Sequence, residues 1–147
     1  MSDFAEEVRR RAIGRCEYCR LPQSAFRRPF HIEHVVARQH GGSSTLDNLA
    51  LACWNCNLKK GPNLSGVDPK TRQVTALFNP RKDRWDEHFS AVVVPLKPLC
   101  VAICGLSAVG RATVQVLGLN DEMRQLIRYE LWVEGLYPDL ASSILPI

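Results

Sequence analysis

The first 62 residues change their hydrophobic pattern in an order that predicts four elements. Apolar side chains recur at helical spacing over residues 2–12, behind a capping Ser or Asp. Residues 30–36 and 45–52 alternate or carry apolar side chains as strands do, with a Gly-Gly turn between them. Residues 54–60 have the pattern of a short helix, which the Gly-Pro pair after them would end. The pattern therefore predicts a helix followed by a strand–turn–strand–helix unit.

The remaining segment, residues 63–147, reads as a mixed extension. Turn-forming pairs within residues 63–79 predict a hairpin or a loop and a strand. A final helix is predicted with Asn120 as its N-cap and Gly135 at its end. The apolar stripe of this helix would be Met123, Ile127 and Leu131. Three further strands are expected at residues 92–94, 99–103 and 112–117. The predicted fold class is α+β, with residues 1–62 as the core and residues 63–147 packed on it.

Charge favours a polyanionic partner only weakly when the whole chain is considered. The formal charge of +4 and the pI of about 8.8 are mildly basic. Residues 90–147 carry four basic and five acidic side chains, so the positive excess lies in the first two thirds of the chain. The charged N-terminus has no apolar signal segment, and no run is apolar and long enough to span a membrane. We therefore expect a cytoplasmic protein without membrane contact.

Two Cys-x-x-Cys pairs frame the chemistry of the N-terminal segment. Cys16 and Cys19 form the first pair, and Cys53 and Cys56 form the second, 33 residues further on. In a reducing compartment such pairs more often bind zinc than form disulfides, since four thiolates satisfy tetrahedral Zn²⁺. The alternative is a set of free, buried or redox-active thiols. We favour a structural zinc whose two knuckles enclose an inserted hairpin.

Between the knuckles lie side chains suited to phosphodiester hydrolysis. A histidine can deprotonate water near neutral pH. A carboxylate and an amide offer oxygen ligands of the kind that Mg²⁺ prefers. The run HIEHVVARQHGGSSTLDNLALACWNCNLKKG resembles the HNH endonuclease family, whose core is a ββα-metal unit. The resemblance rests on Glu33-His34, Gly41-Gly42, Asn48-Leu49 and the motif from Cys53 to Lys60.

The resemblance implies a role for each matching residue. His34 would be the general base, and Glu33 and Asn57 would bind a catalytic Mg²⁺ or Mn²⁺. Asn48 would tie the loop between the strands so that His34 is aimed correctly. The four cysteines would bind the structural zinc, and Lys59 and Lys60 would lie near substrate phosphates. Apart from the resemblance, Arg38 beside the Gly-Gly turn is a candidate contact to nucleic acid, with a solvated loop as the favoured alternative. The family more often has Asp where Glu33 stands.

Two details of this segment follow from strand geometry. Strict alternation would send Glu33 and His34 to opposite faces, so both serve one site only if the strand ends or bends there. His31 shares a face with Glu33 in a regular strand and could be a further ligand or phosphate contact, although a solvated histidine is the favoured interpretation. Trp54, inside the second knuckle, is expected to pack rather than to stack on a base.

The sequence therefore predicts a metal-dependent HNH endonuclease that acts on DNA, with double-stranded DNA favoured, as a monomer or homodimer. The segments RKDRWDEHF and GRATVQVLGLN resemble the C-terminal extension of a bacterial, notably cyanobacterial, subgroup of the family. One alternative is a non-catalytic zinc-knuckle module that binds nucleic acid. Another is a redox or zinc-storage protein. The acid–histidine pair and Asn57 favour the nuclease, since a binding module has no need of them.

Overall fold

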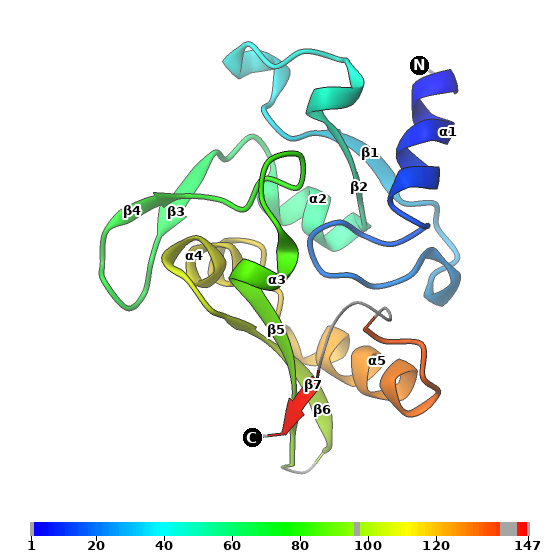
Figure 1. The fold of residues 1–147 in the computed structure, drawn as a ribbon, viewed down its shortest axis with the longest axis vertical. Helices are drawn as coiled ribbons and strands as arrows, with labels where there is room; N and C mark the ends of the chain where they lie inside the picture. Colours follow the sequence, from blue (N-terminus) through cyan, green and yellow to red (C-terminus); the bar gives the residue numbers. More distant parts are fainter. Residues whose placement is uncertain (1, 96–97, 139–143, 147) are drawn as a thin grey trace.

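The computed structural model describes residues 2–95, 98–138 and 144–146, and it has a mixed α+β architecture (Figure 1). Short helices and strands alternate along the whole chain, as the fold class predicted. The elements of the N-terminal part are α1 (Ser2–Arg11), η1 (Gln23–Ala25), β1 (His31–His34), η2 (Arg38–His40), η3 (Leu46–Asn48), β2 (Leu49–Ala52) and α2 (Trp54–Lys60). Those of the rest are β3 (Ser65–Val67), β4 (Val74–Ala76), α3 (Trp85–His88), β5 (Phe89–Val94), β6 (Cys100–Gly105), α4 (Ala108–Val116), α5 (Glu122–Val133) and β7 (Ile144–Pro146).

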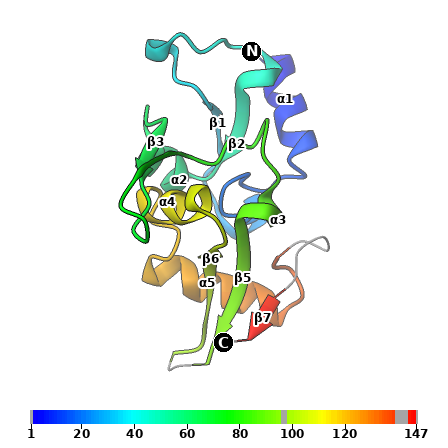
Figure 2. The same cartoon turned by 60° about the vertical axis from the view of Figure 1, so that its left-hand side comes forward.

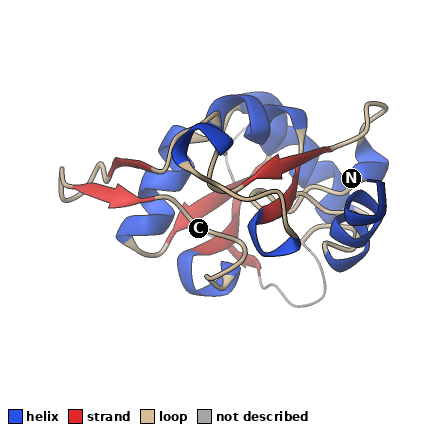
Figure 3. Cartoon of the chain, turned by 90° about the horizontal axis from the view of Figure 1, so that it is seen from above, coloured by secondary structure: helices blue, strands red, loops and turns tan. Residues whose placement is uncertain are grey.

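The described strands form small separate sheets among the helices rather than one continuous sheet (Figure 3). The β1 and β2 strands are antiparallel, with His34 opposite Leu49 and His31 opposite Ala52. A second antiparallel pair joins β3 to β4. In the third sheet β5 lies between antiparallel β6 and parallel β7. Figure 2 shows the long β5–β6 hairpin running away from β1 and β2 towards the C-terminal end.

The predicted strand–turn–strand–helix unit is present as β1, β2 and α2. The side chain of Cys53 caps α2 by accepting a hydrogen bond from the Cys56 amide at 3.4 Å. Gly61 follows the helix with a φ of 50°, a backbone conformation that glycine adopts without strain. Cys53 therefore marks the start of α2 and belongs to the second cysteine pair, and Gly61 marks the end of the helix. The predicted hairpin in residues 63–79 is present as β3 and β4.

Residues 112–117 do not form the predicted strand but lie mostly in α4. The Ser107 side chain accepts a hydrogen bond from the Gly110 amide at 3.0 Å and caps this helix. Ala112 and Thr113 lie on the buried face of the helix, whereas Gln115 is exposed. The β-branched residues of this run favour strands by propensity. The cap and the packing outweigh that preference.

The final helix also differs from its predicted details. Asp121, not Asn120, caps α5 by accepting from the Arg124 amide at 2.9 Å. Asn120 instead pairs with the backbone of Ile103, at 2.7 Å to its amide and 2.8 Å to its carbonyl. The predicted stripe is wrong at Met123, which is 66% exposed. Two arginines of this helix, described below, are buried instead.

One hydrophobic cluster contains residues from both halves of the chain. Trp85 donates its indole N–H to the Tyr18 carbonyl at 2.8 Å, and the Tyr137 hydroxyl donates to the Cys19 carbonyl at 2.9 Å. These bonds join the C-terminal half to the loop that carries the first cysteine pair. Within the described ranges, no helix has the length and apolar character needed to cross a membrane.

Candidate nuclease site

The four cysteines of the two knuckles meet in the interior. Cys16, Cys19, Cys53 and Cys56 are all buried, and their sulfur atoms lie within 4.8 Å of one another. The Cys19 and Cys53 sulfurs are 3.8 Å apart. Zinc–sulfur bonds of about 2.3 Å at tetrahedral angles place neighbouring sulfurs about 3.8 Å apart. The cluster therefore has the ligand type, number and spacing of a structural zinc site.

The electrostatics of this cluster also fit a bound cation. Burial raises the pKa of the Cys16 and Cys56 thiols well above its usual range. Four thiolates could not coexist here without positive charge, because each would repel the others in a medium that solvates ions poorly. A zinc ion would supply that charge and leave the cluster with a net charge of about −2.

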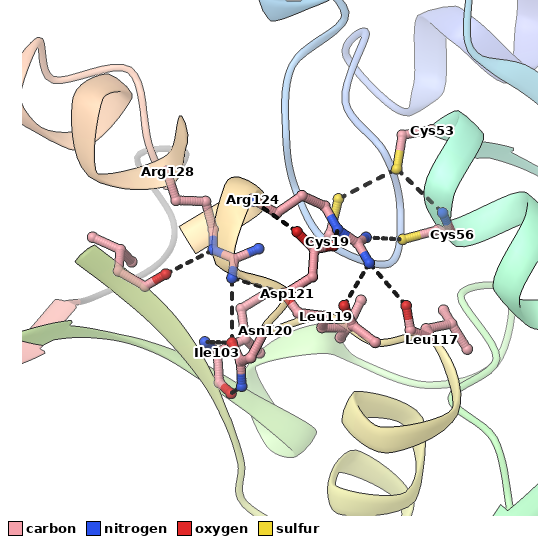
Figure 4. Close-up of polar contacts among 12 residues, drawn as sticks. Cys19, Cys53, Cys56, Ile103, Leu117, Leu119, Asn120, Asp121, Arg124 and Arg128 are labelled. Atoms are coloured by element: carbon pink, nitrogen blue, oxygen red, sulfur yellow. Dashed lines mark hydrogen bonds and ion pairs between the residues drawn. The ribbon is translucent and has the colours of Figure 1, made fainter. Parts of the chain in front are cut away.

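Arg124 of α5 supplies further positive charge next to the cluster (Figure 4). Its guanidinium is almost completely buried and donates to the Cys56 sulfur at 3.3 Å. It also donates to the Leu117 carbonyl at 2.9 Å and to the Asp121 carboxylate at 2.5 Å. Burial alone would lower its pKa, but the neighbouring Cys56 and Cys19 thiolates raise it overall. A hydrogen bond to a ligand sulfur orients that ligand and stabilises its charge.

An open cleft lies against β1 and α2, and the predicted catalytic residues are among those that line it. This open cleft has a volume of about 510 Å³, and its walls include Glu33, His34 and Asn57. Glu33 and His34 are consecutive residues of β1, and they reach one cleft because the strand ends at His34. The sequence placed these three residues together only through a family resemblance. The fold brings them to the wall of the same cleft.

His34 is held at the cleft by a neighbour from the following loop. Its Nε2 lies 2.9 Å from the Ser44 hydroxyl, and its side chain is partly exposed. With Nε2 as the donor in this bond, Nδ1 carries the free lone pair. An imidazole in this state can accept a proton from a water molecule in the cleft.

Glu33 is buried, with only 6% of its surface exposed. Its carboxylate accepts a short hydrogen bond from the Tyr18 hydroxyl and lies 3.6 Å from the Lys60 ammonium. Burial raises the pKa of Glu33 to about 7, although Lys60 and Tyr18 both favour the charged form. A carboxylate that is costly to bury as an anion gains from a cation placed beside it. At the inner wall of the cleft, a divalent cation would share the Glu33 carboxylate with Lys60 and Tyr18.

Asn57 and Asn48 have different surroundings. In the described part of the chain, the Asn57 side chain forms no hydrogen bond, so its amide oxygen can bind an ion in the cleft. Asn48 is buried, and its amide bonds the Val36 amide and carbonyl at 2.9 Å each and the Ser43 carbonyl at 2.8 Å. These three bonds fix both ends of the loop between the strands. The loop in turn places Ser44 against His34.

Close packing explains the second glycine of the predicted turn. A Cβ atom at Gly42 would lie 1.7 Å from the Val36 carbonyl oxygen and 2.8 Å from the Asn48 side-chain nitrogen. Gly41 has a φ of 87°, which also favours glycine. The approach to Val36 therefore requires glycine at position 42, whereas position 41 favours glycine through its backbone conformation.

The predicted nucleic-acid contacts separate into exposed and buried residues. Arg38 and Lys59 are exposed, and Arg38 lies on the rim of the cleft. Lys60 is only 2% exposed, and its ammonium donates to the Val35 carbonyl at 2.8 Å. The Lys60 ammonium faces the Glu33 carboxylate and the His34 carbonyl in the interior. Lys60 therefore has a structural role, because a phosphate cannot reach its side chain. His31 is exposed and does not line the cleft.

Three residues near the two sites had no clear signal in the sequence. Tyr18 looks like a knuckle spacer, Ser44 is one of several polar loop residues, and Arg124 lies 68 positions from its sulfur partner. Each acts through a contact that depends on tertiary packing. The run of small polar residues after Gly42 is the only local hint of a partner for His34.

Comparison with known families agrees with this geometry. Residues 16–63 match the family model described as HNH endonuclease. This segment begins at the first zinc-knuckle cysteine and ends just after α2, so it contains both cysteine pairs and the cleft. No curated protein and no solved structure matches the chain.

Proposed function

We propose that this protein is a divalent-metal-dependent endonuclease that hydrolyses phosphodiester bonds in DNA, since residues 16–63 match the HNH endonuclease family model. The observation that carries the proposal is the open cleft lined by His34, Glu33 and Asn57. It combines a base with two oxygen donors beside a rigid, zinc-type cysteine cluster. A module that only binds nucleic acid would not need this combination.

Each residue has a defined part in the proposed reaction. His34 takes a proton from the attacking water at Nδ1, while Ser44 holds the imidazole through Nε2. Glu33 and Asn57 would hold Mg²⁺ or Mn²⁺ through their side-chain oxygens, the ligand type that these ions prefer. When bound, this ion stabilises the negative charge that develops on the phosphate and the leaving oxygen. Arg38 and Lys59 contact the phosphates of neighbouring nucleotides.

The structural zinc has a separate part in this proposal. Its four sulfur ligands hold the loop of the first knuckle against the start of α2. That loop also carries Tyr18, which bonds Glu33. A zinc ion held by these cysteines would therefore stabilise the inner wall of the cleft without touching the substrate.

The test is nicking of supercoiled plasmid by zinc-loaded protein, with Mg²⁺ withheld and then added back. We expect cleavage only with the added ion. His34→Ala should slow it by about 100-fold or more, the range expected for loss of a general base, with zinc content unchanged. The matched control is His40→Ala, an exposed histidine that does not line the cleft, which should cut at nearly the parent rate.

Two outcomes would contradict the assignment. Equal cleavage by His34→Ala and the parent would show that another group is the base. Plasmid binding without cleavage under any divalent ion would leave the non-catalytic zinc-knuckle module as the better description.

A further inference from the structure

A second pocket has three aromatic residues, Phe26, Phe30 and Trp54, among those that line it. It has a volume of about 300 Å³, and its other lining residues are Arg27, Arg28, Cys53 and Asn55. Phe30 is buried, so Trp54 and Phe26 offer the more accessible rings. The Phe26 and Phe30 rings are 5.6 Å apart between centroids. Trp54 is 48% exposed, which is unusual for a side chain of this size. Trp54 was expected to pack rather than to stack on a base, but about half of its surface is free for contact.

The loop that forms this pocket is held in place before any ligand binds. Gln23 accepts from the Phe30 amide at 2.6 Å and donates to the Arg28 carbonyl at 2.8 Å. Arg9 of α1 donates to the Phe30 carbonyl at 3.2 Å. A fixed loop presents its aromatic walls without an ordering cost on binding.

The two arginines beside the rings are available to a ligand. Arg27 and Arg28 are both exposed. Among the residues that the structure describes, neither guanidinium forms a hydrogen bond or ion pair. The pocket therefore combines apolar planar walls with two free positive charges. This combination is complementary to a planar heterocycle attached to an anion.

The pocket and the nuclease cleft are lined by neighbouring residues of the same two segments of the chain. Phe30, directly before β1, lines the pocket, whereas Ile32 and His34 of β1 line the cleft. On α2, Trp54 lines the pocket and Leu58, one turn later, lines the cleft. Four residues of strand span about 13 Å, which equals about four nucleotide steps along a stacked strand. A nucleic-acid strand in the cleft can therefore reach the pocket.

From these contacts we infer that the pocket of Phe26, Phe30 and Trp54 binds an unstacked nucleobase of the substrate strand, while Arg27 and Arg28 contact its phosphates. Aromatic faces bind bases of any sequence, because every base has a π-face. This inference rests on the proposed function for its ligand class. It adds that the enzyme binds strands with an unpaired base more tightly than fully paired duplex.

The experiment measures binding separately from cleavage. Zinc-loaded protein without added Mg²⁺ is titrated against fluorescein-labelled oligothymidine of about a dozen nucleotides, and against a duplex of the same length, by fluorescence anisotropy. Trp54→Ala should weaken oligothymidine binding about tenfold or more and duplex binding less than about twofold. Trp54→Phe should retain most of the affinity because it keeps an aromatic face.

The matched control is Trp132→Ala, which removes another partly exposed tryptophan, 36% exposed on α5. It should leave both affinities unchanged. Zinc content and the unfolding midpoint of each variant establish that it is folded. Arg27→Ala with Arg28→Ala should weaken binding and flatten its dependence on salt.

The outcomes separate this inference from the proposed function. Equal affinities of Trp54→Ala and the parent for oligothymidine, or equal losses for oligothymidine and duplex, would overturn the base pocket. The plasmid assay would still decide the nuclease activity. Conversely, selective loss of oligothymidine binding in a protein that never cuts plasmid would support the pocket and overturn the hydrolytic assignment.

Discussion

At the scale of single residues, Asn48 shows how one buried amide fixes the geometry of a reactive side chain. Its three hydrogen bonds link Val36, at the start of the loop between the strands, to Ser43 near its end. Ser44 follows directly and contacts His34. The position of the proposed base thus depends on an amide that does not touch it.

A substitution at Asn48 tests this dependence. Asn48→Asp keeps the acceptor for the Val36 amide but loses both donors and places a carboxylate against two carbonyl oxygens. We expect the free energy of unfolding to fall by about 1–3 kcal/mol and the nicking rate to fall with it, while zinc content is retained. Urea unfolding, zinc analysis and the plasmid assay measure the three effects.

The control for this variant is Asn63→Ala, which removes an exposed amide after α2. It should change neither stability nor rate appreciably. A fully stable and active Asn48→Asp protein would show that the loop is held by other contacts.

At the scale of elements, α5 stabilises the cysteine cluster from the far end of the chain. Arg124 and Arg128 are one helical turn apart and both almost completely buried. Arg124 reaches the Cys56 sulfur, whereas Arg128 bonds the Val101 and Leu119 carbonyls at 2.9 and 2.7 Å. Figure 4 shows the two side chains next to each other with these separate sets of partners.

Comparing variants at Arg124 and Arg128 measures how far α5 contributes to zinc affinity. Arg124→Ala should weaken zinc binding by about 10–100-fold, as expected when the hydrogen-bond partner of a ligand is removed. Arg124→Lys keeps the charge but not the planar fork, and should give an intermediate loss. Arg128→Ala removes an equally buried guanidinium without a sulfur contact, so it should lower stability more than zinc affinity.

Competition with a chromophoric zinc chelator gives the affinities. Equal zinc affinities for Arg124→Ala and Arg128→Ala would show that α5 contributes only general packing at this site.

At the scale of the whole molecule, local signals in the sequence predicted the elements that depend on neighbouring residues. The ββα order, the cysteine pairs and the end of α2 at Gly61 all follow from motifs within a few residues. The helix α4, the cap at Asp121 and the burial of Lys60 did not follow. Each of these depends on partners distant in the chain, such as Glu33 for Lys60. The exposure of Trp54 was missed for the same reason, since packing partners decide burial.

The contact between Asp68 and Arg111 predicts how the molecule responds to acid. Asp68 is buried after β3, and Arg111 of α4 binds both its carboxylate oxygens at 2.9 Å. The Arg111 guanidinium holds the pKa of this carboxyl well below its usual range, helped by the Lys70 amide and the Thr71 hydroxyl. The unfolded chain therefore takes up this proton at higher pH than the folded protein does. The stabilisation is present above about pH 4 and is lost as pH falls further.

We expect Asp68→Asn to be less stable than the parent at neutral pH, with a difference that narrows as the pH falls below about 4. Urea midpoints measured across this range test the sign. Loss of zinc in acid affects both proteins alike and cancels in the difference. The exposed Asp86→Asn is measured alongside as the control variant. A constant difference between Asp68→Asn and the parent would contradict the linkage.

The bond from Arg124 to the Cys56 sulfur has a practical consequence for protein engineering. A fragment cut after residue 63 would retain the complete family match but lose Arg124, Trp85 and Tyr137, which together contact Cys56 and the first knuckle. Such a fragment should be a poor cassette for fusion to a heterologous DNA-binding protein. Transplanting the proposed activity should require the C-terminal segment as far as Tyr137.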